Sequence, residues 1–428
     1  MRIAVIGTGY VGLVTGVCLA KLGHQITCCD IVREKVDLIN QGKSPIFEPQ
    51  VEELLKSGIA SGKFKATTDV KGAVSESQVS FICVGTPSQK DGSIDLSYVK
   101  SAAGTIAQAL KDGHVVVVKS TVVPGTTESL IPILEKSGKK FGLCMNPEFL
   151  KEGSAVSDFL NPNLIVLGAR DEKSGKVLAE VYSSFDCPKI DADLRTAEML
   201  KYAENSFLAT KVSFINEIAN LCEKAGVDVT KVARAIGLDP RIGPEFLRAG
   251  CGFGGSCFPK DVKAIVSWSK SRGYEPKLLE SVLELNNKQP LLMVEMAQKA
   301  LGNLENKTIS ILGLAFKPGT DDIREAPSLK IIQKLLDSKA RVKVYDPKAL
   351  EPVKKVFGGK LIYSPTLNEC LKDSEAALII TEWEQIRKLG PADFKSMKKP
   401  LVIDGRRIFD PQKFLNQGID FHAIGWSK

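Results

Sequence analysis

The chain has 428 residues, 43% of them hydrophobic and 25% charged, and this length exceeds what one hydrophobic core usually supports, so we expect several domains. The net charge of +8 is moderate and the lysines are spread along the chain without interleaved aromatic residues, which argues against nucleic-acid binding and fits an anionic small-molecule substrate. Because no long apolar run and no signal-peptide pattern occur, we expect no membrane segment and a cytoplasmic protein.

A dinucleotide-binding fingerprint opens the chain. A predicted buried strand leads into the turn Gly7-Thr8-Gly9-Tyr10-Val11-Gly12, then a helix, then a second strand that ends at Asp30. The glycines admit a pyrophosphate to the helix N-terminus, and Asp30 can accept hydrogen bonds from a ribose diol. Asp30 favours NAD over NADP because it would repel a 2'-phosphate, although Arg33 and Lys35 leave that choice open.

Polar residues follow the next predicted strands, at 79–84, at 115–119 and just before Asn146. Ligands of an open α/β sheet lie beyond the carboxyl ends of its strands, so we expect Thr86, Ser120 and Thr121 on the cofactor side. Glu148 and Glu152 follow the third strand. Two carboxylates there can serve as bases near the nicotinamide, or they are solvated residues of a turn.

A long helix is predicted from Arg195 to Ala225, which contains neither proline nor glycine. Apolar residues form two stripes along it, which is typical of a helix enclosed on two sides, as in a domain-bridging or dimer-forming helix. Lys201 and Asn205 lie one turn apart on one stripe. Burial would lower the pKa of Lys201 and suit it to proton transfer or oxyanion stabilisation; the alternative is a lysine that snorkels at the helix edge.

Four glycines lie in the six residues from Gly250 to Gly255, and Cys257 follows them. Pro259 fits the start of a helix, so Cys257 is expected just outside a helix N-terminus and next to Lys260, where positive charge favours a thiolate. The alternative is an ordinary loop with a small buried cysteine. The ten cysteines are scattered without a CxxC pair, so we expect neither a disulfide framework nor a metal site.

The last third repeats the order of the first. A strand and glycine within 307–317, a helix at 328–338 and a strand at 341–345 predict a second doubly wound domain that has lost the fingerprint. Four cationic residues stand at or beside its strand ends, where they can hold phosphates or form a basic rim without a ligand. They are Lys317, Arg324, Arg406 and Arg407.

The predicted fold class is therefore α/β, with two doubly wound Rossmann-like domains joined by a central all-helical domain. We expect the NAD-binding domain at 1–194, the helical domain at 195–302 and the second Rossmann-like domain at 303–428. The three histidines, His24, His114 and His422, fit solvated turns, so we expect acid–base groups of other types.

A cysteine beside a nicotinamide suggests more than one oxidation. A first hydride transfer converts a primary alcohol to an aldehyde. A thiolate can add to that aldehyde to give a thiohemiacetal, which loses a second hydride and becomes a thioester that water cleaves to an acid.

Five motifs together resemble the nucleotide-sugar 6-dehydrogenases over essentially the whole chain. Besides the fingerprint and Phe316-Lys317, they are Asn146-Pro-Glu-Phe-Leu-Lys-Glu152-Gly, Lys201-Tyr-Ala-Glu-Asn205 and Phe253-Gly-Gly-Ser-Cys257-Phe-Pro-Lys-Asp261. The resemblance implies a four-electron oxidation of UDP-glucose to UDP-glucuronate with two NAD reduced. GDP-mannose and the UDP-N-acetylhexosamines are the alternative substrates, and the loop at 148–153 and the run 235–243 favour UDP-glucose.

The resemblance also implies the residues' roles. Cys257 is the nucleophile, Lys201 and Asn205 stabilise oxyanions, Asp261 with Lys201 assists proton removal through water, and Glu148 is the base for thioester hydrolysis, with Thr121 ordering water. NAD would contact Gly7, Thr8, Gly9, Tyr10, Val11, Gly12, Asp30, Lys35, Thr86, Thr121, Glu152 and Arg324. The sugar nucleotide would contact Phe149, Leu150, Lys151, Glu152, Lys201, Asn205, Arg248, Phe253, Gly254, Lys317 and one of Arg406 and Arg407. A helix-mediated homodimer is implied, with Arg241 reaching the substrate across the interface.

Two other functions compete with this one. A two-electron hydroxy-acid dehydrogenase would use Lys201 and Asn205 but leaves Cys257 and the third domain unexplained. A nucleotide-sugar sensor would bind both ligands without producing NADH, and the presence of Cys257, Lys201, Asp261 and Glu148 argues against it.

Overall fold

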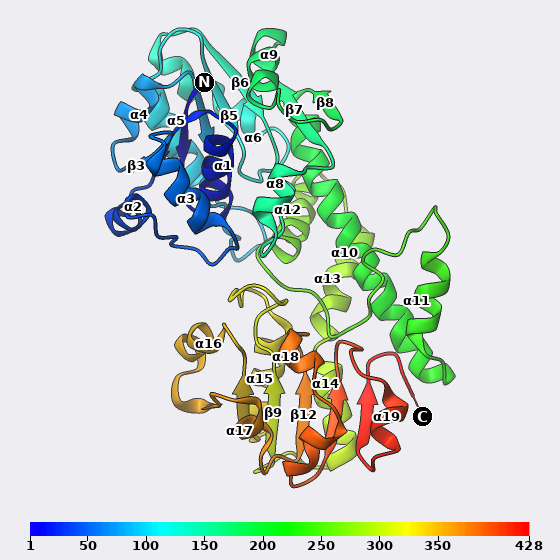
Figure 1. The fold of residues 1–428 in the computed structure, drawn as a ribbon. Coiled ribbons are helices and arrows are strands. Elements are labelled where there is room, and N and C mark those ends of the chain that lie inside the picture. The colour runs from blue at the N-terminus through cyan, green and yellow to red at the C-terminus, as the bar shows by residue number, and fades with distance from the viewer. Residues whose placement is uncertain (428) are drawn as a thin grey trace. The chain divides into compact units, whose positions relative to one another are not determined.

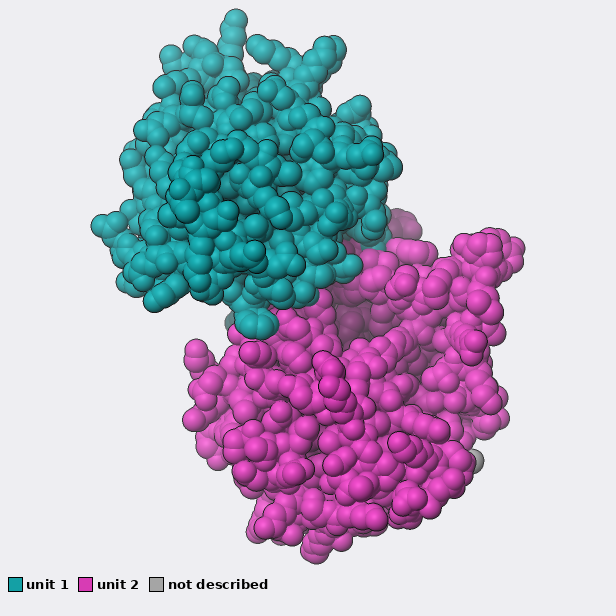
Figure 2. Space-filling model, viewed as in Figure 1, with its two compact units in different colours: residues 1–204, 263–272 teal, residues 205–262, 273–428 magenta. Residues whose placement is uncertain are grey.

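The computed structural model describes residues 1–427, which form two compact units (Figure 2). Unit 1 contains residues 1–204 and 263–272, and unit 2 contains residues 205–262 and 273–428. The division falls inside two helices, α10 (Leu194–Ala225) and α12 (Phe258–Ser271). No helix in the described part of the chain is both long and apolar enough to cross a membrane.

Unit 1 is built on an eight-stranded sheet of order β3-β2-β1-β4-β5-β6-β7-β8, which is parallel except where β6 and β7 meet (Figure 1). Its first six strands have the dinucleotide-binding order. The strands are β1 (Arg2–Ile6), β2 (Gln25–Cys29), β3 (Phe64–Thr67), β4 (Val79–Ile82), β5 (His114–Val118), β6 (Phe141–Met145), β7 (Ile165–Ala169) and β8 (Lys189–Ala192).

The helices of unit 1 form two groups. In one group α1 packs against α3 and α8, and in the other α5 packs against α4 and α7. Strand order reverses between β1 and β4, so right-handed crossovers place these groups on opposite faces of the sheet. The helices are α1 (Tyr10–Lys21), α2 (Arg33–Asn40), α3 (Val51–Ala60), α4 (Val70–Glu76), α5 (Ser97–Ala107), α6 (Thr126–Ser129), α7 (Ile131–Leu134), α8 (Ala155–Leu160) and α9 (Glu172–Val181).

Unit 2 repeats this strand order in a six-stranded parallel sheet, β11-β10-β9-β12-β13-β14 (Figure 1). Its three central strands, β9, β12 and β13, are almost wholly buried, as the continuous apolar runs predict for a parallel sheet covered on both faces. The strands are β9 (Thr308–Leu312), β10 (Arg341–Tyr345), β11 (Ile362–Tyr363), β12 (Ala376–Ile379), β13 (Leu401–Asp404) and β14 (Asp420–Ala423).

Helices from the middle of the chain share the core of unit 2. Met293, Val294 and Ala297 of α14 are buried in the same cluster as the second sheet, and so are Ile215 and Ala219 of α10. The helices are α11 (Val229–Gly237), α13 (Lys277–Lys288), α14 (Leu291–Leu301), α15 (Pro327–Asp337), α16 (Leu350–Phe357), α17 (Leu367–Leu371), α18 (Glu384–Arg387) and α19 (Pro411–Leu415).

The predicted fold class is confirmed: two Rossmann-like sheets flank a helical region, and the second sheet repeats the first. The domain limits at 194 and 302 stay a prediction. One expectation is wrong. His114 does not lie in a solvated turn; it is the first residue of β5 and is 3% exposed, with its ring between the Ser80 hydroxyl (2.8 Å) and the Ser77 carbonyl (3.2 Å).

Candidate active site

The first glycine turn is shaped by steric limits at Gly7 and Gly12. A side chain at Gly7, whose φ is +98°, would stand 2.8 Å from the Cys83 carbonyl oxygen, and one at Gly12 would stand 1.9 Å from the Gly7 carbonyl oxygen. Gly9, by contrast, has open space where a Cβ would lie, and it is the N-cap of α1 without a side-chain cap. The open position faces a helix N-terminus, so this turn fits a pyrophosphate.

Asp30 stands at the carboxyl end of β2, where the fingerprint requires an acid. Its carboxylate accepts hydrogen bonds from the Thr8 amide (3.0 Å), the Thr8 hydroxyl (2.5 Å) and the Val32 amide (3.0 Å). Burial raises the pKa of Asp30, but these hydrogen bonds and nearby Lys35 outweigh it and the pKa is lowered. Asp30 is therefore ionised at neutral pH, as a partner of ribose hydroxyls should be.

The loops after β4 and β5 are joined beside this turn. The Thr86 hydroxyl donates to the Thr121 carbonyl oxygen (3.0 Å), and the Ser120 hydroxyl donates to that of Val84 (2.7 Å). Thr121 is partly exposed, whereas Thr86 and Ser120 are buried. Of the residues expected on the cofactor side, Thr121 thus presents the most accessible surface.

Glu148 and Lys201 form a buried pair within unit 1. Their side chains are 6% and 4% exposed, and Glu148 Oε1 lies 3.7 Å from Lys201 Nζ. The other carboxylate oxygen of Glu148 accepts from the Leu150 amide (2.6 Å), and the Lys201 ammonium lies 5.0 Å from the centre of the Phe149 ring. Glu148 is therefore not a solvated turn residue, and Lys201 does not snorkel to solvent.

The loop that holds Glu148 is fixed by a buried carboxylate, Glu48, that the sequence did not indicate. The Glu48 carboxylate is buried and accepts from the amides of Gly153 (2.6 Å) and Ala155 (2.8 Å), while the Tyr10 hydroxyl also accepts from Gly153 (2.9 Å). Glu48 follows a stretch without hydrophobic periodicity, so no pattern marked it. Lys151, one of the predicted contacts, points to Asp158 instead, with Nζ 3.4 Å from its carboxylate.

A buried lysine was also missed. Lys119 directly follows β5 and is 4% exposed, and its ammonium donates to Asn146 Oδ1 (2.8 Å) and to the Tyr182 hydroxyl (3.4 Å). Asn146 in turn donates to the Val166 carbonyl oxygen (2.8 Å), so the network ties the start of the Glu148 loop to β7. Burial lowers the pKa of Lys119 to about 8.

In unit 2, Cys257 directly precedes the first residue of α12, as predicted. Its side chain is partly exposed, and its sulfur lies 3.6 Å from the Ser256 hydroxyl oxygen. Asp261, one turn later, is 1% exposed. The Asp261 carboxylate accepts from Asn205 Nδ2 (2.7 Å) and pairs with Lys260 Nζ (2.5 Å), so these polar groups gather in the first turn of the helix.

The glycine loop before Cys257 packs closely against other segments of unit 2, to which it belongs. Added Cβ atoms would stand 2.8 Å from the Gly405 carbonyl oxygen at Gly250, 2.8 Å from Asn286 Oδ1 at Gly252, and 2.5 Å from the Glu325 carbonyl oxygen at Gly254. At Gly255, whose φ is +88°, the clash is with the Phe316 ring at 2.8 Å. The protein's own atoms thus require the glycines, whatever the ligand.

Several buried amides hold this loop, and two of them, Asn286 and Gln289, lie in the middle of the chain and were not foreseen. Asn286 Oδ1 accepts from the Phe253 amide (2.8 Å) and its Nδ2 donates to the Phe253 carbonyl oxygen (3.0 Å), while Gln289 donates to the Gly250 carbonyl oxygen (3.0 Å). The Phe253 ring also packs edge-on against Phe258, at 5.8 Å between centroids. Amides on a helix resemble ordinary polar surface in sequence, so their burial could not be predicted.

Two of the predicted basic residues lie beside the glycine loop. Arg406 donates to the Gly252 carbonyl oxygen (3.2 Å), and the Lys317 ammonium lies over the Phe316 ring (5.5 Å) that contacts Gly255. Arg407 differs: its side chain is 5% exposed and ion-pairs with Asp228 at the start of α11 (2.7 Å). Of the two neighbouring arginines, only Arg406 is thus tied to this loop by a hydrogen bond.

The other three predicted arginines are more exposed and are held by nearby acids. Arg324 pairs with Asp322 (2.7 Å), Arg248 with Glu382 (3.1 Å) and Arg241 with Asp239 (2.6 Å). The Arg241 side chain is 87% exposed in the single chain.

Three models of one family match successive parts of the chain, all described as UDP-glucose/GDP-mannose dehydrogenase family. The NAD binding domain matches residues 1–186, the central domain residues 195–288 and the UDP binding domain residues 310–411.

Known proteins match the chain over nearly its whole length. UDP-glucose 6-dehydrogenase TuaD of Bacillus subtilis is 44% identical, over 99% of this chain and 93% of that protein. The solved UDP-glucose dehydrogenase of Pyrobaculum islandicum superposes with a TM-score of 0.94 at 40% identity, covering 99% of this chain and 98% of that one. The UDP-D-ManNAc dehydrogenase of Pyrococcus horikoshii reaches a TM-score of 0.89 at 31% identity and covers 99% of both chains.

Proposed function

The chain belongs to the UDP-glucose/GDP-mannose dehydrogenase family, and we propose that it catalyses the four-electron oxidation of UDP-glucose to UDP-glucuronate. It is an NAD-dependent oxidoreductase, and its cofactor is NAD. The choice of UDP-glucose is supported by relatives of that name at 40–44% identity, against 31% for the UDP-D-ManNAc enzyme.

The observation that carries this proposal is the setting of Cys257. Eight of the ten cysteines are buried, and Cys257 is one of two that are partly exposed. It alone stands immediately before a helix, with Asn205, Lys260 and Asp261 arranged around the first turn. A thiol at a helix N-terminus is disposed to form a thiolate, which is the reactive nucleophile.

In the first oxidation the substrate's primary alcohol becomes an aldehyde. NAD would supply the hydride acceptor for this step, and a second NAD would supply it for the next. We assign the stabilisation of the oxyanion to Lys201 and Asn205, whose side chains donate hydrogen bonds and whose burial strengthens them. The alcohol proton leaves through water with the assistance of Asp261 and Lys201.

The second oxidation proceeds on the cysteine. The Cys257 thiolate adds to the aldehyde carbon and forms a thiohemiacetal, which loses hydride and a proton to become a thioester. Water then attacks the thioester carbon, the carbon–sulfur bond breaks, and the acid and the thiolate are released. Glu148 is assigned as the base that takes the proton from this water, which Thr121 helps to order, and its carboxylate lies 3.7 Å from Lys201 Nζ.

The binding residues are assigned from the resemblance of the sequence motifs. We assign NAD to the turn from Gly7 to Gly12 and to Asp30, which is supported by the open position at Gly9 and the ionised carboxylate. We assign the sugar nucleotide to Lys317 and Arg406, both of which stand beside the glycine loop. We prefer Arg406 to Arg407 for this role because the Arg407 guanidinium is buried against Asp228.

We further propose that the chain acts as a homodimer in the cytoplasm, joined along α10. Four apolar residues seven positions apart stay 36–64% exposed on this helix, which is the repeat of a helix-pairing seam. They are Leu200, Phe207, Phe214 and Leu221. Arg241 is a candidate to reach the partner's substrate, since its side chain is exposed. Ten free cysteines suit a reducing compartment.

The test is the yield of NADH. With limiting UDP-glucose and excess NAD, the enzyme should release two NADH per sugar and UDP-glucuronate as the sole sugar product. A yield of one NADH with free aldehyde would contradict the covalent mechanism and support the two-electron alternative. Ligand binding without NADH would support the sensor.

A further inference from the structure

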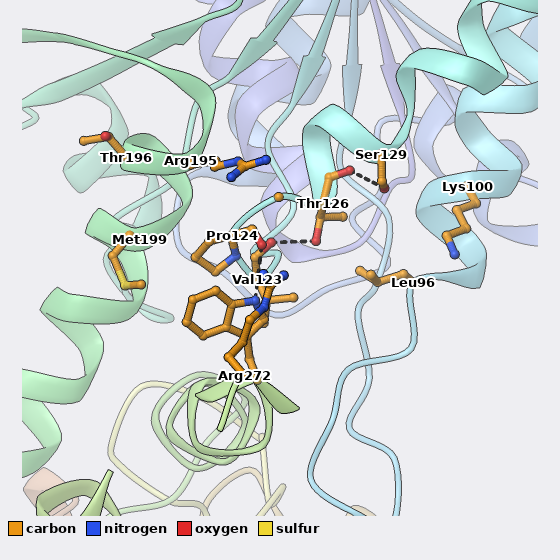
Figure 3. A pocket seen from close by; sticks show the side chains of 12 residues that line it. Leu96, Lys100, Val123, Pro124, Thr126, Ser129, Arg195, Thr196, Met199 and Arg272 are labelled. Carbon is orange, nitrogen blue, oxygen red and sulfur yellow. Dashed lines mark hydrogen bonds between the residues drawn. The ribbon is translucent and has the colours of Figure 1, made fainter. Parts of the chain in front are cut away.

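Unit 1 contains a pocket that is separate from the residues assigned to NAD and the sugar nucleotide. Its volume is about 660 Å³, and it is lined by α5, the loop that enters α6, the first turns of α10 and the last turns of α12 (Figure 3). None of the residues assigned above to catalysis, NAD or substrate lines it. The volume is in the range of pockets that hold small organic ligands.

The lining is positively charged. Lys100, Arg195 and Arg272 face the pocket, and no acidic residue lines it. Arg195 is paired with Glu128 (2.6 Å), and the Arg272 guanidinium lies 5.0 Å from the centre of the Trp268 ring. Lys100 and Arg272 are exposed, so their charges are available to a ligand at the mouth of the pocket.

The floor of the pocket is apolar and contains an aromatic ring in a fixed position. The Trp268 indole donates from Nε1 to the Pro124 carbonyl oxygen (3.2 Å), which orients the ring. Val123, Leu96 and Met199 add apolar surface around it. Figure 3 shows Lys100 on α5, on the opposite side of the pocket from Met199 on α10.

We propose that this pocket is a binding site for an organic anion with a flat aromatic part, of about the size of a mononucleotide. The aromatic part would stack against Trp268 and the Arg272 guanidinium, and the anionic group would be held by Lys100 and Arg272. A simple inorganic anion would leave the apolar floor and most of the volume unused. This assignment is independent of the proposed function.

The test uses 8-anilinonaphthalene-1-sulfonate, an aromatic sulfonate, with the full-length protein, and only the binding that is lost when the cations of the pocket are replaced is assigned to the pocket. The chain has three tryptophans, so the part of the energy transfer that Trp268→Phe removes reports binding close to Trp268. We expect saturable binding of about one probe per chain, weakened roughly tenfold in the double variant Lys100→Gln/Arg272→Gln. The matched control, Lys136→Gln/Lys139→Gln, removes two exposed charges outside the pocket and should change the dissociation constant less than about twofold.

Two competition arms define the ligand class. Adenosine 5'-monophosphate should displace the probe at concentrations at which inorganic phosphate does not. Equal displacement by phosphate would overturn the aromatic part of the assignment, and unsaturable binding or an unaffected double variant would overturn the site. NADH formation from UDP-glucose should be retained in the double variant, so failure here is distinguishable from failure of the proposed function.

Discussion

Two cysteines of the same loop stand in opposite environments. Cys251 is fully buried, with its sulfur 3.9 Å from the Ile380 carbonyl oxygen, and burial raises its pKa. Cys257, six residues later, is partly exposed at the start of α12. Only Cys257 combines access with a helix N-terminus, so reactivity should be confined to it.

Replacing each cysteine in turn tests this difference. Cys257→Ser should slow the formation of UDP-glucuronate by roughly 10³-fold or more, because serine is far less nucleophilic at neutral pH. Cys251→Ala should keep two NADH per sugar and lose about 1 kcal/mol of stability. The measurements are NADH yield and mass spectrometry of the protein for a sugar adduct. Unchanged turnover in Cys257→Ser would remove this residue from the mechanism.

Because of Lys119, the free energy of unfolding is expected to depend on pH in the alkaline range. Its pKa is about 8 in the folded protein, because of burial, and 10.5 in an unfolded chain. Between these values the unfolded state binds more protons than the folded state, so this residue's contribution to the free energy of unfolding rises with pH, by on the order of 3 kcal/mol at most. The stability difference between wild type and Lys119→Met should therefore grow in favour of wild type from pH 8 to pH 10.5.

Urea unfolding at a series of pH values measures this difference. Lys111→Met is the control, because Lys111 is exposed, and its stability difference from wild type should stay flat. A flat difference for Lys119→Met as well would mean that the buried ammonium stays protonated throughout.

The residues at strand ends and helix starts could be identified from the sequence. The buried residues that hold their loops in place could not. Asp30, Glu148 and Cys257 follow recognisable patterns, so their local positions could be predicted. Glu48 and Lys119 act through partners more than 25 positions away in the chain, at Gly153 and Asn146. Such contacts depend on tertiary packing, which no local pattern encodes.

At the scale of elements, α10 has two unlike faces. The stripe that contains Ile215, Ala219 and Cys222 is buried, as predicted for a core-facing stripe. The other stripe, with Phe207 and Phe214 at 64% and 49% exposure, is not enclosed within the chain. Burying one such side chain contributes roughly 1.5–3 kcal/mol, so four repeated on each chain favour pairing.

A charge at the centre of this stripe should break the dimer. Phe207→Glu would bury a carboxylate in each half of the proposed seam, so we expect monomers in sedimentation-velocity runs at micromolar concentration, where we expect wild type to form dimers. Tyr274→Glu places the same charge at an exposed aromatic residue outside α10 and should leave the dimer intact. A wild-type chain that sediments as a monomer would overturn the dimer proposal.

Several of the regular elements were predicted from their hydrophobic patterns. Strands β1, β2, β9, β10, β12 and β13, and helices α10 and α15, lie within a few residues of the expected limits. The antiparallel direction of strand β7 could not be predicted, since a buried strand has the same hydrophobic pattern in either direction. The glycine loop was recognised, but the atoms that require its glycines come from Gly405 and Phe316, far away in the sequence.

At the scale of the molecule, the function rests on two nucleotide-binding domains of the same topology and unequal chemistry. The first keeps its glycine turn and Asp30, whereas the second keeps one glycine, Gly313, whose φ is +94° and which packs against Thr381. The Asp346 carboxylate stands where Asp30 stands in the first domain, but it is 1% exposed and accepts from the Leu314 amide and the Trp383 indole. The second domain therefore cannot offer this acid to a ribose, and one NAD site per chain is expected.

This difference between the two domains leads to expectations for which cofactor and which sugar nucleotide the enzyme prefers. With UDP-glucose, NAD should be preferred over NADP, because Asp30 is ionised and repels a 2'-phosphate. With NAD, kcat/KM for UDP-glucose should exceed that for GDP-mannose and UDP-N-acetylmannosamine by roughly 10²-fold or more, since a wrong base leaves polar groups unpaired and an added acetyl group must fit a packed loop. NADH absorbance measures every combination, with sugar-free reactions as blanks. A higher kcat/KM for UDP-N-acetylmannosamine would reassign the substrate while leaving the cysteine chemistry in place.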